Sequence, residues 1–175
     1  MPMTTYPFEQ ECAFVFDHVA AATAVINSYV REESSEKDPV RDSLRGPLLA
    51  GEITPYQIAS SPEYRDWIRD MDLDNVSDAH DLLSDADVDE IVHCSEFEGS
   101  AEPSRHFAEF DGKSVSFDDD FALFIVPDKE SGLFSAAYAS PSDLMEEYKE
   151  KLMPFLGEDF PYGSRIMDVT GTYFC

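Results

Sequence analysis

The sequence predicts an α+β fold, in which several N-terminal helices precede a small, mostly antiparallel sheet with one packed helix. In the first half of the chain, apolar residues recur at helical spacing, and after residue 105 they recur at every second position. This change of period marks the passage from helices to strands. We expect a mainly helical acidic lobe over residues 1–110 and a lobe of β-hairpin, helix and strand over residues 111–175, together forming one compact unit.

The first predicted element is a long amphipathic helix over residues 9–30, because Val15, Val19, Ile26 and other apolar residues recur at helical spacing. The polar run that follows it ends at a proline. A shorter helix is then expected over residues 40–49, closing near Gly51.

Hydroxyl side chains mark the next helix starts. Thr54 and Ser61 each precede a proline, which favours an N-cap followed by proline at the first helical position. Ser77 and Ser84 have the same capping chemistry, and the helix that begins at Ser84 is expected to run through Cys94.

Strand patterns dominate the remainder of the chain. Strands are expected at residues 115–117, 121–126, 133–139 and 165–174. The turn over residues 127–132 predicts a hairpin between the second and third of them. One amphipathic helix, starting at Pro141 and ending before Gly157, separates this hairpin from the last strand.

Charge is the most informative feature of the sequence. The 175 residues include 37 Asp and Glu against 12 Lys and Arg, for a formal net charge of -25. With 43% hydrophobic residues the chain is expected to fold, unlike a disordered acidic tail. Such a field repels nucleic acid and anionic membranes and attracts basic surfaces, so we expect a protein partner and no direct binding of nucleic acid or membrane.

The acids are densest between residues 70 and 104, where no Lys or Arg occurs. The predicted partner-binding residues are Asp70, Asp72, Asp74, Asp78, Asp81, Asp85, Asp87, Asp89, Glu90, Glu96, Glu98 and Glu102, together with Asp118, Asp119 and Asp120. Mutual repulsion among these groups destabilises a compact state, so the pattern favours a role in solubility or in binding a basic partner.

No catalytic or metal-binding motif stands out. The four histidines His18, His80, His93 and His106 include no pair at the i, i+4 spacing of a helical zinc site. His93 and Cys94 are adjacent, and on the expected helix they point about 100° apart. Paired carboxylates are so frequent that they predict no glycosidase. We therefore expect a protein that is not an enzyme and needs no metal or cofactor.

One acidic run resembles a calcium loop. Asp85, Asp87 and Asp89 stand at positions one, three and five of such a loop, and Glu96 stands at position twelve. Glu90 occupies position six, where the sharp turn calls for glycine, so a calcium site is not predicted.

Three unpaired cysteines and the lack of a leader-like or membrane-spanning segment favour a reducing, cytoplasmic location.

The charge density matches that of a short DNA duplex. Duplex DNA carries one negative charge per roughly 1.7 Å of axis, so 25 charges correspond to about 42 Å. A compact chain of this length is about 40 Å across. We therefore expect an acidic DNA mimic that occupies the DNA-binding site of another protein. Two alternatives stay open: an acidic immunity protein or antitoxin that neutralises a basic toxin, and a halophile-adapted domain.

The C-terminal stretch 162–174 contains Gly163, Arg165 and Asp168 ahead of Gly171 and two aromatic residues. This stretch resembles the closing segment of ArdA antirestriction proteins, which are acidic DNA mimics of similar length. The resemblance implies a phage or mobile-element inhibitor of type I restriction enzymes. Inhibitors of CRISPR complexes reach the same electrostatic solution on unrelated folds, so the expected partner is the basic DNA-binding groove of a defence nuclease or CRISPR complex. The sequence leaves open whether the chain forms a homodimer.

Overall fold

The structure is a computed structural model of the chain, and it describes residues 5–86, 88, 91–94, 101–103, 122–125 and 141–174. Side chains are described for residues 13–86, 88 and 142–167. The helices are α1 (His18–Arg31), α2 (Pro39–Leu49), α3 (Pro55–Ser60), α4 (Arg65–Asp70), α5 (Val76–Asp85) and α6 (Pro141–Leu156), with 3-10 turns η1 (Pro62–Tyr64) and η3 (Tyr162–Arg165). The strands are β1 (Thr5–Phe16), β2 (Ile91–Cys94), β3 (Ala101–Pro103), β4 (Ala122–Ile125) and β5 (Ile166–Phe174).

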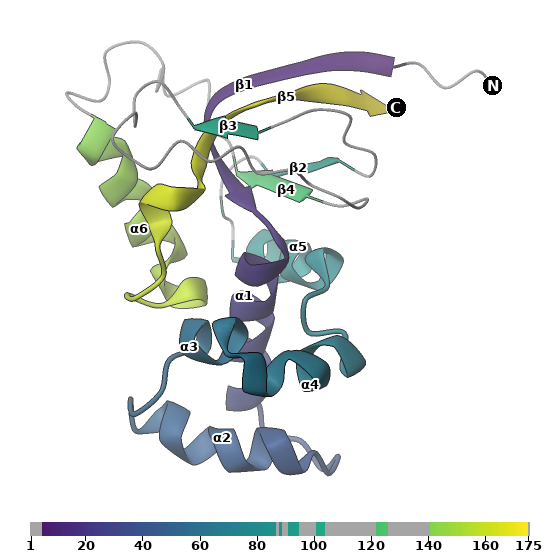
Figure 1. Cartoon of the computed structure of the whole chain (residues 1–175), viewed down its shortest axis with the longest axis vertical. Coiled ribbons are helices and arrows are strands. Elements are labelled where there is room, and N and C mark those ends of the chain that lie inside the picture. Colours follow the sequence, from purple (N-terminus) through teal and green to yellow (C-terminus); the bar gives the residue numbers. More distant parts are fainter. Residues whose placement is uncertain are drawn as a thin grey trace.

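The strands form one sheet at one end of the molecule, and helices α1 to α5 extend away from it (Figure 1). The strand order is β2-β4-β1-β5-β3, and every neighbouring pair is antiparallel. The α+β fold class is therefore confirmed. Strand β1 lies at the centre, and its longest pairing is with β5 from the opposite end of the chain. The sheet thus combines strands from both sides of residue 110.

The long helix predicted over residues 9–30 is wrong in its first part, because β1 continues to Phe16 and α1 begins only at His18. The side chains from Ala13 to Phe16 are all buried, at 0–1% exposure. A strand covered on both faces has an unbroken apolar run, and such a run cannot be told from a buried helix by periodicity. The true start signal is Asp17, whose Oδ1 accepts a hydrogen bond from the Ala20 amide at 3.0 Å.

The helix predicted from Ser84 through Cys94 is also wrong. Helix α5 ends at Asp85, and Ile91–Cys94 is strand β2, paired with β4. The α5 N-cap is Asn75 and not Ser77, since the Asn75 side chain accepts from the Ser77 amide. His93 and Cys94 therefore lie in strand β2 and not on the helix expected for them.

Other local signals are confirmed. Gly51 adopts φ 72° just beyond α2, and Gly157 adopts φ 81° just beyond α6, as expected of helix-terminating glycines. Thr54 forms a capping box with Gln57 at the start of α3. Ser61 caps η1, which continues into α4. Strands β4 and β5 fall within the ranges predicted for them to about a residue, whereas the predictions at 115–117, 127–132 and 133–139 lie outside the described residues.

The core lies between the sheet and the helices. Helix α1 packs against α2, α3, α5 and α6, and its buried alanines allow this close approach. Phe14 of β1 contacts an aromatic cluster, with ring centroids 5.7 Å from Tyr148 and 6.2 Å from Tyr162.

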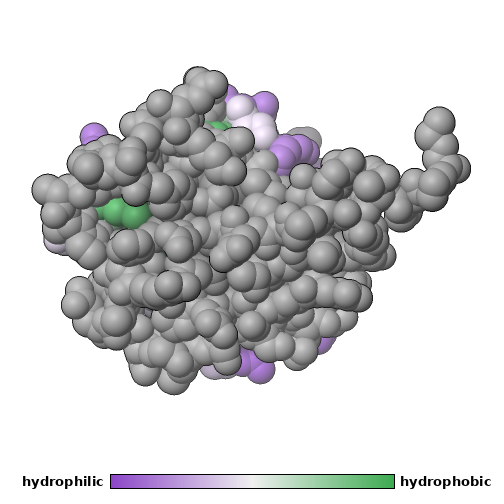
Figure 2. Space-filling view, turned by 90° about the horizontal axis from the view of Figure 1, so that it is seen from above, coloured by the Kyte–Doolittle hydropathy of each residue, from purple (hydrophilic) through white to green (hydrophobic). Residues whose placement is uncertain are grey.

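Figure 2 views the molecule from the sheet end, where hydrophilic side chains of the described part appear mainly at the rim. None of the described helices is long and apolar enough to cross a membrane.

Candidate functional site

Six of the predicted partner-binding acids lie in one continuous part of the structure, which we call the acidic segment (residues 70–85). It comprises the last residue of α4, the turn that follows and helix α5, and its acids are Asp70, Asp72, Asp74, Asp78, Asp81 and Asp85. Glu102 lies in β3, where only the backbone is described. The remaining predicted residues, Asp87, Asp89, Glu90, Glu96, Glu98, Asp118, Asp119 and Asp120, lie outside the described residues.

Helix α5 separates its acids from the core. Val76, Ala79 and Leu83 are buried on one side, at 3%, 0% and 0% exposure. Asp78, Asp81 and Asp85 follow one another at intervals of three and four residues and are exposed, Asp81 with 83% of its side chain. These intervals place the three carboxylates on one face of the helix, about 5 Å apart along its axis. The amphipathic pattern therefore fixes a row of negative charge facing solvent.

The turn between α4 and α5 is a Schellman motif. The amide of Leu73 donates to the carbonyl of Ile68 at 2.9 Å, and the amide of Asp72 donates to the carbonyl of Arg69 at 3.1 Å. Asp72 adopts φ 57°, the left-handed conformation that this position requires. Leu73 and Ile68 are both buried, which supplies the hydrophobic contact typical of the motif.

Further hydrogen bonds join this turn to α5 and α1. Asn75 Nδ2 donates to Asp72 Oδ2 at 3.2 Å, while Asn75 Oδ1 accepts from the Ser77 amide at 2.9 Å. Nδ1 of His18, at the start of α1, lies 3.4 Å from the carbonyl oxygen of Asp74. The acids of the turn are consequently held in a defined backbone conformation.

Several basic side chains in the described part are engaged with acids of the same molecule. Arg69 lies 3.1 Å from Asp66 and 3.6 Å from Asp70. Other ion pairs join Arg45 to Glu33 at 3.5 Å, Lys151 to Glu147 at 3.0 Å and Arg165 to Asp17 at 3.0 Å. The guanidinium of Arg41 is buried. Because these cations are paired or enclosed, the field at the surface is dominated by the excess carboxylates.

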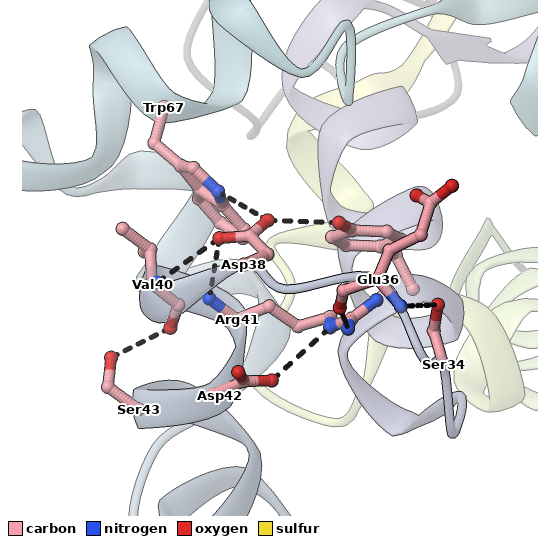
Figure 3. A network of polar contacts seen from close by, with 9 residues as sticks. Ser34, Glu36, Asp38, Val40, Arg41, Asp42, Ser43 and Trp67 are labelled. Carbon is pink, nitrogen blue, oxygen red and sulfur yellow. Dashed lines mark hydrogen bonds and ion pairs between the residues drawn. The ribbon is translucent and has the colours of Figure 1, made fainter.

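A second polar cluster, which sequence reasoning missed, surrounds the buried carboxylate of Asp38 (Figure 3). Asp38 Oδ2 accepts hydrogen bonds from the Tyr29 hydroxyl at 2.9 Å and from Trp67 Nε1 at 3.1 Å. Its Oδ1 accepts from the amides of Val40 and Arg41 at 3.1 and 3.2 Å, which makes it the N-cap of α2. The available signal was the Asp-Pro pair, which has the same cap-and-proline chemistry as Thr54 and its proline.

The hydrogen bonds keep Asp38 ionised despite its burial. Burial alone would raise the pKa of this carboxyl, but hydrogen bonds from Trp67, the Arg41 amide, Tyr29 and the Val40 amide together hold it below its ordinary value. The pKa of Tyr29 is raised, first by burial and then by its hydrogen bond to Asp38. The cluster is therefore a satisfied anionic cap that connects α1, α2 and α4.

Arg41 completes the cluster. Its guanidinium carbon lies 4.9 Å from the centre of the Tyr29 ring, a cation–π arrangement. Its Nη2 donates to the carbonyl of Glu36 at 2.6 Å, and its Nε lies 3.7 Å from the exposed Asp42 carboxylate. Arg41 therefore joins the Tyr29 ring of α1 to the segment that precedes α2.

The described residues offer no group of three or more His, Cys, Asp or Glu side chains suited to a metal ion. A shallow hollow of about 610 Å³ lies beside α6 and is lined by Glu146, Lys149, Glu150, Met153 and Pro154. Both acidic and basic side chains line this hollow. Among the described residues, the acidic segment is therefore taken as the candidate site, because it gathers six of the predicted partner-binding acids.

Comparison with protein-family models, with curated proteins and with solved structures found no match to this chain.

Proposed function

We propose that this protein is a DNA-mimic inhibitor that occupies the DNA-binding site of a host defence complex, either a restriction enzyme or a CRISPR effector. The observation that carries the proposal is the exposed row of carboxylates on the acidic segment, within a stretch of sequence that has no Lys or Arg. Carboxylates accept charge-assisted hydrogen bonds from Lys and Arg, as DNA phosphates do. No cofactor is needed for such blockade, and a target of this kind acts in the cytoplasm of the host cell.

The spacing of the row supports a collective mechanism. On α5 one carboxylate occurs about every 5 Å, whereas one strand of duplex DNA presents a phosphate every 3.4 Å or so of axis. A single face of α5 thus offers roughly two-thirds of the linear charge of one DNA strand. Acids of the turn and of the rest of the chain must contribute the remainder, so inhibition should depend on the sum of many charges and little on any one of them.

The test compares two variants with the same net charge. The first replaces Asp70, Asp74, Asp78, Asp81 and Asp85 with Asn, and the second replaces five exposed acids elsewhere, Glu32, Glu52, Glu63, Glu146 and Glu158, with Gln. DNA cleavage by a purified type I restriction enzyme and by a purified CRISPR effector nuclease is measured against inhibitor concentration, with circular dichroism as the check of folding. We expect the acidic-segment variant to lose at least ten times more inhibitory potency than the matched control.

Three further results bear on the alternatives. A short DNA duplex should compete with the inhibitor for its target, and inhibition should weaken as salt rises. If a single alanine substitution in the acidic segment abolished inhibition, the compact hot spot of an immunity protein would explain the data better. Equal potency of the two variants, or absence of inhibition by the wild-type chain across both enzyme classes, would reject the proposal.

A further inference from the structure

Helix α4, which leads into the acidic segment, has few means of holding its own orientation. It spans the six residues Arg65–Asp70, and its N-terminus has no side-chain cap. A helix this short is not stable by itself. Its buried apolar side chain is Ile68, while Trp67 is half buried. Contacts with other elements must therefore set its rotation about its own axis.

Trp67 makes such a contact through a hydrogen bond, whose strength depends on the direction of its N–H. Among the described residues, its indole N–H provides the one side-chain hydrogen bond from α4 to a distant element, reaching Asp38 Oδ2 at 3.1 Å. The ring also packs against Tyr64 and Tyr29, with centroid distances of 6.3 and 6.4 Å. A hydrogen bond constrains rotation more sharply than ring packing, because it weakens steeply when the donor turns away from the acceptor.

The acceptor itself is immobilised. Asp38 is buried, caps α2 through two backbone amides and also accepts from the Tyr29 hydroxyl of α1. Four donors converge on this one carboxylate, so it cannot follow a movement of α4 without breaking the others. Trp67 thus donates to a carboxylate that is itself fixed by hydrogen bonds from both α1 and α2 (Figure 3).

We infer that Trp67 is a positioning residue for the acidic segment: its hydrogen bond to Asp38 sets the rotation of α4 and hence the placement of Asp70 and Asp72. This inference rests on the proposed function. The Schellman motif transmits the rotation, because the amides of Asp72 and Leu73 bond to α4 carbonyls. A rotation of about 30° would move a carboxylate on the surface of a helix of about 5.5 Å radius by about 3 Å. That displacement is close to the 3.4 Å or so between successive phosphates of a DNA strand.

The acids on α5 depend less on this contact. Val76, Ala79 and Leu83 hold α5 against the core independently. The inference therefore concerns the α4 end of the acidic segment, and it predicts a partial loss of inhibition when the hydrogen bond alone is removed.

The test uses Trp67→Phe, which keeps an aromatic ring but removes the N–H donor, in the full-length chain. Its control is Ile166→Val, a small loss of buried volume at the start of β5, which we expect to lower the melting temperature from a position outside α4. The probes are the purified type I restriction enzyme and the purified CRISPR effector nuclease, each assayed by DNA cleavage. Backbone hydrogen exchange is measured over residues 65–73 in both variants.

We expect Trp67→Phe to raise the inhibitory concentration at least fivefold and exchange over residues 65–73 at least tenfold, with both little changed in Ile166→Val. The slope of log inhibition against log salt should equal that of the wild type, because no charge is altered. Inhibition by Trp67→Phe within twofold of Ile166→Val overturns the inference while leaving the proposed function intact. If the wild-type chain inhibits neither enzyme, the proposed function fails and the inference fails with it.

Discussion

Replacing Asp38 with alanine is the most severe test of the buried cluster. The substitution removes the N-cap of α2, which is worth about 1 kcal/mol. It also leaves the Tyr29 hydroxyl and Trp67 Nε1 without their acceptor, at about 1 kcal/mol for each of these partly buried donors. We therefore expect Asp38→Ala to lower the free energy of unfolding by about 3 kcal/mol, a large part of the total for a domain.

Urea unfolding followed by circular dichroism at fixed salt measures this loss. Asp38→Asn is the control: its amide oxygen keeps the cap of α2, but its NH2 group stands where Oδ2 accepts from Tyr29 and Trp67, so the substitution should cost about 2 kcal/mol. Adding Tyr29→Phe, which keeps the ring, should destabilise the wild-type chain but stabilise Asp38→Ala, because in the latter it removes a donor that has lost its partner. Failure of that reversal of sign, or a loss under 1 kcal/mol in Asp38→Ala, would refute the reasoning.

The other predictions concern pH and the acidic segment. Because the pKa of Asp38 is lowered in the folded state, the advantage of wild type over Asp38→Asn should be constant above about pH 5 and decline as pH falls through the unfolded pKa of about 3.9 to the folded value, as checked by urea unfolding across pH. Asp72→Gly and Asp72→Ala remove the same charge, yet the glycine variant should be more stable by about 1 kcal/mol because φ is 57° at this position; equal melting temperatures would contradict this. Asp85→Asn, in the last turn of α5, should stabilise by about 0.5 kcal/mol, and Asp78→Asn, in the first turn, should destabilise by a similar amount, since the helix dipole acts oppositely at the two ends; thermal unfolding that shows the same sign for both would count against it.

Local backbone chemistry is the part of this fold that the sequence predicts well. Thr54 with its following proline and Gly51 after α2 specify helix boundaries within a few residues, so their signals are legible without tertiary information. The sequence does not predict the start of α1, because β1 is central in the sheet and its last residues, Ala13 to Phe16, are all buried, which removes the alternation that identifies a strand. Its main partner, β5, lies at the other end of the chain, and no local pattern encodes such a pairing.

The candidate site likewise has a part that the sequence predicts and a part that it does not. Exposure of Asp78, Asp81 and Asp85 follows from their spacing against the apolar face of α5, and the sequence alone predicts it once the helix is recognised. The Asp38 cluster depends on side chains that meet from three elements, with Trp67 29 residues away in the sequence. Convergence of this kind is a property of tertiary packing, so it became visible only in the structure.

Added salt should change the stability of the fold and the inhibition of a target in opposite directions. Carboxylates about 5 Å apart on α5 repel one another at all moderate ionic strengths, and more distant acids cease to interact as the Debye length falls from about 30 Å at 0.01 M to about 8 Å at 0.15 M. Added salt should therefore raise the free energy of unfolding, since it relieves repulsion in a chain of net charge -25. The same screening weakens attraction to a basic groove, so inhibition should decline over the same range. A halophile-adapted domain would share only the first trend. If stability rises and inhibition falls over the same salt series, the acidic surface serves binding. A domain that is only adapted to salt would gain stability without losing the binding of a partner.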